Sequence, residues 1–100
     1  MISSLRIGSF DFSVSLNTDI RKDGNIGWLD HQHSAIHIAD DMDAHCTLQT
    51  ILHEVVHEIL IQSGQRLGSK EEGVVDAVAF GWYQVMRDNP QLVKLITKGK

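Results

Sequence analysis

The sequence predicts an α+β domain in which a small, mostly antiparallel, three-stranded sheet at the N-terminus is packed by three helices. Two patterns carry this prediction. Apolar and polar residues alternate over much of the first forty positions, as in half-buried strands, whereas beyond position 46 apolar residues recur three and four apart, as on a helix face. With 100 residues and 42% hydrophobic content, residues 1–100 are expected to form one domain with one core.

The first strand signal covers positions 10–16. Four apolar residues occupy alternate positions there: Phe10, Phe12, Val14 and Leu16. The apolar residues before Gly8 have the opposite parity, so we expect a bulge or a break at Gly8-Ser9.

Two further strands are expected before position 40. Asp23-Gly24 is a strong turn signal, which suggests a hairpin with a return strand over 26–30. The third strand is expected at 34–39, with Ile36 and Ile38 on one face and His37 pointing to the other.

The strongest helical signal covers positions 47–62. Its apolar residues have the spacing of one broad buried face: Leu48, Ile51, Leu52, Val55, Val56 and Ile59. Asp43 or Thr47 is the expected N-cap, and Gly64 is the expected left-handed residue at the C-terminal end.

Two more helices are expected after a short connector. Ser69 to Glu72 has the pattern of a capping box that opens the second helix. Its expected apolar positions are Val74, Val75, Val78, Trp82, Val85 and Met86, and we expect both Trp28 and Trp82 in the core. Asn89 as N-cap and Pro90 at the first helical position predict the third helix.

The 47–62 helix contains the sequence His53-Glu54-Val55-Val56-His57. Residues four apart on a helix lie one above the other, so the imidazoles of His53 and His57 converge as two ligands of one metal ion would. Glu54 lies one step round the helix, where it can reach a metal-bound water as a general base. The alternative is that both histidines flank a core face and that Glu54 and Glu58 are solvated.

A catalytic zinc normally has three protein ligands, so a third must come from another segment. The second helix offers Glu72 as a ligand, and Asp76 follows one turn later to accept a hydrogen bond from a ligand histidine. Within a capping box, however, the Glu72 carboxylate would turn back to the Ser69 amide, and Glu71 would be the third ligand. Both assignments stay open at this point.

Further residues are candidates for assisting the reaction. Tyr83, His37 and His45 could donate a hydrogen bond to a developing oxyanion, although a packed aromatic residue is the simpler interpretation of Tyr83. His31 and His33 are interpreted as surface or loop residues. The strand at 35–39 could pair with an extended peptide substrate if it lies at the sheet edge.

The motif His53-Glu54-Val-Val-His57, followed by Glu72-Gly-Val-Val-Asp76, resembles the HExxH plus ExxxD pattern of gluzincin metallopeptidases. The β-rich start and the Ile-His-Ile strand before the motif resemble the ImmA/IrrE family, and most of all its short members encoded in phages and prophages. The resemblance covers roughly residues 25 to 92. The sequence departs from thermolysin-like enzymes in the short interval of 14 residues between His57 and Glu72.

The resemblance implies a zinc-dependent endopeptidase with one zinc ion per chain, acting on a protein or peptide such as a regulatory, repressor-like protein. His53, His57 and Glu72 would be ligands, Glu54 the general base, and Asp76 a hydrogen-bond partner of a ligand. The alternative function is a non-catalytic zinc-binding module that captures such a protein, and a third is an α+β interaction domain without metal. Manganese or cobalt would also suit the ligand set.

Composition excludes other classes of function. The net charge of −4 does not favour nucleic-acid binding, and no apolar run approaches the roughly 18 residues of a membrane span. The N-terminus lacks the pattern of a signal peptide, and Cys46 is the single cysteine. We therefore expect a cytoplasmic protein, in a bacterial host cell or encoded by a phage, with no membrane or nucleic-acid partner.

Overall fold

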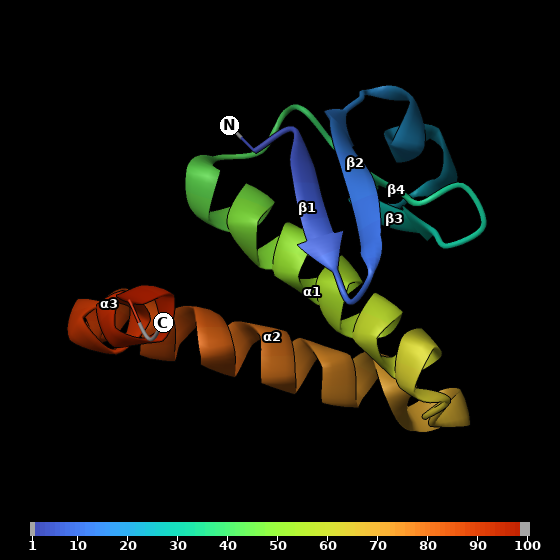
Figure 1. The fold of residues 1–100 in the computed structure, drawn as a ribbon. Coiled ribbons are helices and arrows are strands. Elements are labelled where there is room, and N and C mark those ends of the chain that lie inside the picture. The colour runs from blue at the N-terminus through green and yellow to red at the C-terminus, as the bar shows by residue number, and fades with distance from the viewer. Residues whose placement is uncertain (1, 99–100) are drawn as a thin grey trace.

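The computed structural model describes residues 2–98 and shows an α+β fold with a mixed four-stranded sheet and three α-helices (Figure 1). The elements, in order along the chain, are β1 (Ser4–Ile7), β2 (Phe10–Leu16), the 3-10 helix η1 (Asp19–Asp23), β3 (Gly27–Asp30), β4 (Ala35–Ile38), α1 (Ala44–Ser63), the 3-10 turn η2 (Gly68–Lys70), α2 (Glu71–Asp88) and α3 (Pro90–Lys98). The HExxH sequence lies in α1, which is the first α-helix but the second helical element of the chain, because the 3-10 helix η1 precedes it.

The sheet differs from the predicted one in strand number and topology. Its order is β1-β2-β4-β3, with β1 antiparallel to β2, β2 parallel to β4, and β3 antiparallel to β4. The expected break at Gly8-Ser9 is a turn that separates two strands. The hairpin predicted at Asp23-Gly24 is wrong, because β4 lies between β2 and β3. β4 takes the central place since it is the most thoroughly buried strand, and parallel pairing favours strands of that kind.

One face of the sheet forms the core against α1. Phe12, Val14, Ile36 and Ile38 are buried there and pack with Ile51 of the helix. Phe10 and Leu16, predicted for the same face, are exposed because they lie at the two ends of β2 beyond the area that α1 covers. The alternation therefore predicted the orientation of β2 correctly but overestimated how much of the strand is buried.

Helix α1 lies between the sheet and α2, so that it contacts both layers (Figure 1). Its predicted ends are confirmed: the Asp43 carboxylate accepts a hydrogen bond from the backbone N–H of Cys46 at 2.8 Å, and Gly64 adopts a left-handed conformation with φ of 72°. The sheet-facing side of α1 buries two carboxylates, Glu54 and Glu58, among its apolar residues. The alternative in which these two glutamates are solvated is therefore wrong.

Helix α2 packs against α1 in the antiparallel direction. It begins without the predicted capping box. The 3-10 turn η2 takes up Ser69, and the residue before α2, Lys70, makes no side-chain cap. Val75 and Ala79 are buried, and the small Ala79 side chain permits a close approach of α2 to α1. The prediction that Trp28 and Trp82 belong to the core is wrong, since both are about half exposed.

The last helix, α3, begins at Pro90, as the sequence predicts. The Asn89 side chain donates a hydrogen bond back to the Val85 carbonyl at the end of α2. No residue of α3 is buried. In the part of the chain that the structure describes, no helix combines the length and the apolar character needed to cross a membrane.

Candidate metal centre

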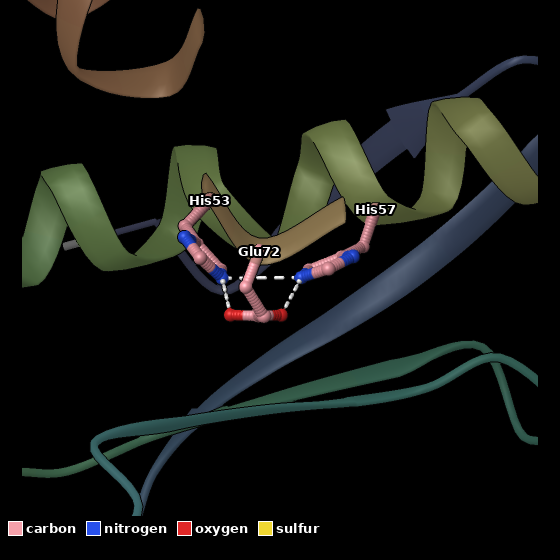
Figure 2. Close-up of side chains that lie close together, drawn as sticks. All are labelled: His53, His57 and Glu72. Atoms are coloured by element: carbon pink, nitrogen blue, oxygen red, sulfur yellow. Dashed lines mark hydrogen bonds and ion pairs between the residues drawn. The ribbon is translucent and has the colours of Figure 1, made fainter. Parts of the chain in front are cut away.

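Three side chains from two helices converge on one point between α1 and α2 (Figure 2). The Nε2 atoms of His53 and His57 lie 3.1 Å apart, and the two Glu72 oxygens lie 3.1 Å from His53 Nε2 and 2.6 Å from His57 Nε2. One nitrogen from each histidine and a carboxylate oxygen all lie within 4.8 Å of one another. The structure thus brings together the three residues that the sequence suggested as a ligand set.

The opposite ring nitrogens of both histidines contact carboxylates. His53 Nδ1 lies 2.7 Å from an Asp76 oxygen, and His57 Nδ1 lies 2.7 Å from a Glu71 oxygen. An ionised carboxylate can only accept, so each Nδ1 carries the proton. The Nε2 atom of each ring is then the nitrogen that faces the shared point, where it could bind a metal ion.

This donor set fits a divalent metal ion. The Nε2 atoms of the two histidines lie 3.1 Å apart beside the Glu72 oxygens, and imidazole nitrogens and carboxylate oxygens are common ligands of such ions. Tetrahedral zinc, with metal–nitrogen distances of about 2.0–2.1 Å, holds its ligand atoms roughly 3.3 Å apart. The two Nε2 atoms, and His53 Nε2 and its Glu72 oxygen, lie close to this separation at 3.1 Å. Two imidazoles and one carboxylate leave the fourth position of such a site open.

Glu71, the alternative candidate for the third ligand, does not point at the place where the two Nε2 atoms converge. Its carboxylate contacts His57 Nδ1, accepts from the Leu67 backbone N–H at 3.2 Å and accepts from Arg66 Nε at 3.0 Å. The Leu67 hydrogen bond, followed by those from His57 and Arg66, lowers the pKa of Glu71 to about 2. Glu71 is therefore an ionised acceptor that orients His57, and Glu72 supplies the converging oxygen.

Glu54 is buried beneath the cleft, against the backbone of β3. A Cβ atom on Gly27 would lie 2.9 Å from a Glu54 oxygen and 2.5 Å from the Thr50 methyl carbon, so only glycine leaves room for both side chains. Burial raises the pKa of Glu54, an effect partly offset by the nearby His53 and His57 rings and reinforced by the Glu72 charge. A carboxylate with a raised pKa is suited to accept and return a proton.

A cleft of about 1140 Å³ opens over the three converging side chains. Residues 24–29, which include the start of β3, form one wall, and Glu72, Asp76 and Phe80 of α2 belong to the other. Figure 2 shows the three side chains pointing toward the side on which the teal β3–β4 segment passes. Among the residues that the structure describes, β3 pairs with β4 alone, so its second edge carries no neighbouring strand.

The three candidate oxyanion donors do not line this cleft. Tyr83 lines a second, apolar cavity of about 320 Å³ between β1, α1 and α2, and its hydroxyl hydrogen-bonds to His45 Nδ1, which also contacts Arg87. His37 lies on the outer face of the sheet, stacked on Trp28 at 5.0 Å and hydrogen-bonded to Ser15. The orientation of His37 away from the apolar face is confirmed.

Sequence reasoning missed the role of Glu58 and His31. Glu58 is fully buried, and both of its oxygens lie within 2.9 Å of His31 Nδ1. The interpretation of His31 as a simple surface residue is therefore incomplete, whereas His33 does pair with Asp30 at the surface. The signal was the spacing of Glu58, seven residues after Ile51, which places it on the sheet-facing side of the helix.

Comparisons with known proteins do not assign a family. No protein-family model, no curated protein and no solved structure matches this chain.

Proposed function

We propose that this protein is a zinc-dependent metallopeptidase that hydrolyses a peptide bond with Glu54 as general base. The observation that carries the proposal is the convergence of His53 Nε2 and His57 Nε2, 3.1 Å apart, with the Glu72 carboxylate on one point between α1 and α2. The HExxH and ExxxD motifs, with their resemblance to the ImmA/IrrE family and to gluzincins, support the same reaction class. One zinc ion per chain would bind to His53, His57 and Glu72.

A zinc ion bound there would supply Lewis acidity, which lowers the pKa of water and polarises a carbonyl group. Glu54 takes a proton from the attacking water and delivers it to the leaving amine as the C–N bond breaks. Burial raises the pKa of its carboxyl group, so the protonated form is accessible for the second step. Asp76 and Glu71 keep the two imidazoles oriented through their Nδ1 protons.

The free edge of β3 is the proposed binding site for the substrate backbone. The strand at 35–39, considered for this role if it lay at an edge, is the central β4 and has both neighbours in place. β3 is the edge strand beside the cleft, and an extended peptide could add to it by main-chain hydrogen bonds. Such a substrate would be an extended segment of a protein, for example a regulatory protein in the cytoplasm.

The first experiment is to measure the zinc content of protein purified without chelator, beside the His53→Ala/His57→Ala double variant. About one zinc per chain, lost in the variant, is expected. Hydrolysis of unstructured proteins and of a peptide library by the zinc-loaded protein is then measured beside the Glu54→Gln variant. Loss of hydrolysis in that variant, with zinc retained, would support the assigned mechanism.

Two results would overturn the proposal. Absence of stoichiometric metal after zinc is added back would leave an interaction domain without a metal. Zinc binding without hydrolysis, together with partner binding that Glu54→Gln leaves unchanged, would instead establish the non-catalytic capture module.

A further inference from the structure

A second polar network lies on the sheet-facing side of α1, one turn beyond Glu54. Its centre is Glu58, whose side chain is fully buried. The carboxylate contacts His31 Nδ1 at 2.8 and 2.9 Å and accepts from Gln62 Nε2 at 2.8 Å. A buried carboxylate is stable only when such donors compensate for its lost hydration.

The network reaches both edge strands of the sheet. Gln62 Nε2 also donates to the Ile7 carbonyl, 3.0 Å away, at the end of β1. Gly8 follows in the left-handed region, with φ of 61°, and a Cβ there would lie 2.0 Å from the Gln62 oxygen. On the other side, His31 directly follows the last residue of β3. One carboxylate of α1 therefore ties down the ends of β1 and β3.

The two ends of β3 are held on α1 in different ways. At the start of the strand, Gly27 rests against Thr50 and Glu54 because it has no side chain. At the far end, the His31 imidazole is fixed by Glu58, which lies one helical turn after Glu54. The strand between these two points forms part of the wall of the cleft.

We propose that His31 and Glu58 are positioning residues for the hydrolytic site, because they clamp β3 to α1 and so hold its free edge at a set distance from the three converging ligands. This inference rests on the proposed function, since β3 is taken there as the substrate-binding edge. Neither residue lines the cleft, so they act through the strand rather than by contact with substrate.

The test compares His31→Ala with His31→Asn and His33→Ala in the zinc-loaded protein. Asparagine carries an N–H donor at the same distance from the backbone as histidine Nδ1, so His31→Asn is expected to restore the clamp. His33 lies in the same turn and pairs with Asp30 at the surface, which makes His33→Ala the matched control. Amide hydrogen exchange and steady-state peptide hydrolysis are measured for all three variants.

In His31→Ala, the amides of residues 27–30 are expected to exchange about ten-fold faster, while those of β1 and β2 keep their wild-type rates. KM is expected to rise about ten-fold at nearly unchanged kcat, the effect of losing one or two backbone hydrogen bonds to bound substrate. A purely structural role would lower stability and leave KM unchanged at temperatures where all variants are folded.

Four results would count against these assignments. Unchanged exchange in residues 27–30 of His31→Ala would overturn the clamp itself. Faster exchange with an unchanged KM, or an equal effect of His33→Ala, would overturn the positioning role. If the zinc-loaded wild type hydrolyses no peptide, the proposed function fails, and hydrogen exchange still decides whether His31 and Glu58 hold β3.

Discussion

Glu54 and Glu58 are two carboxylates on the same face of one helix, a single turn apart, and both are buried. Glu58 is surrounded by donors from His31 and Gln62. Glu54 has no hydrogen-bond donor among the residues that the structure describes, and burial raises its pKa. The same residue type, buried on the same helix face, is therefore suited to structure where donors compensate its charge and to proton transfer where they do not.

The largest expected effect is on kcat, which should fall when Glu54 is replaced but not when Glu58 is replaced. Glu54→Gln is expected to lower kcat by about 10²–10⁴-fold, the usual contribution of a general base, while zinc content stays at one per chain. Glu58→Gln keeps a hydrogen-bonding side chain in the network and is expected to leave kcat nearly unchanged. Steady-state kinetics on the zinc-loaded proteins measure both, and an equal loss of kcat would remove the functional distinction.

A second difference is expected between Glu71 and Glu72, which are adjacent in the sequence: substitutions at the two should change zinc affinity by different amounts. Glu72→Ala removes the oxygen proposed as a zinc ligand, so it is expected to weaken zinc binding more than Glu71→Gln does. Glu71→Gln removes the charged partner of His57 and should weaken zinc affinity about 10–100-fold. Competition with a chromophoric chelator gives both dissociation constants. The reverse order would make Glu71 the third ligand after all.

The stability of the metal-free protein should depend more on Glu58 than on Glu54, which is the reverse of the order expected for kcat. Glu58→Ala leaves two donors without their acceptor and opens a cavity, so the free energy of unfolding should fall by about 2–3 kcal/mol. Glu54→Gln replaces a buried carboxyl group that has no hydrogen-bond donor among the described residues, and is expected to be neutral or stabilising. Urea unfolding of chelator-treated samples measures this, with Glu54→Gln as the internal reference.

Gly27→Ala tests the space that keeps Glu54 against β3. The new methyl group would lie 2.5 Å from the Thr50 side chain, so the strand or the helix must shift. A loss of about 1–3 kcal/mol is expected from this overpacking, together with lower peptide hydrolysis. Thr50→Ser/Gly27→Ala should recover part of the stability, and no recovery would show that the clash lies elsewhere.

The smallest effect concerns the start of α1. The hydrogen bond from the Cys46 backbone N–H lowers the pKa of Asp43 below its ordinary 3.8. Ionised Asp43 therefore stabilises the fold above pH 3.8, and this contribution disappears as the pH falls through the lowered pKa. Asp43→Ala should lower the thermal midpoint of the metal-free protein by a few degrees at pH 7 and by less at acidic pH. Asp43→Asn, which keeps a cap without a charge, should show no such pH dependence.

Local features of the chain could be predicted because they depend on neighbours in sequence. The spacing of four places His53 and His57 on one helix face, and Asp43 and Gly64 act within a single helical turn. Glu72 and Asp76 were predicted as one stripe for the same reason, and both face His53 in the structure.

Tertiary structure alone decided how separate segments meet. β4 inserted between β2 and β3 because its side chains are the most apolar and fill the sheet centre, which alternation within one strand cannot reveal. Glu71 turned to His57 because the backbone of Leu67 and the side chain of Arg66 surround its other oxygen.

Helical periodicity in the sequence therefore determined that His53 and His57 share one face of α1 and that Glu72 and Asp76 share one face of α2. The packing of α2 on α1 decided that Glu72, and not Glu71, meets both Nε2 atoms. The surroundings of these side chains could not be predicted in this way. The free edge of β3 follows from the strand order, and the contacts of Gly27 with Glu54 and of His31 with Glu58 join residues more than twenty positions apart. Such contacts depend on the packing of whole elements, and packing is decided by the shape and charge of both partners together.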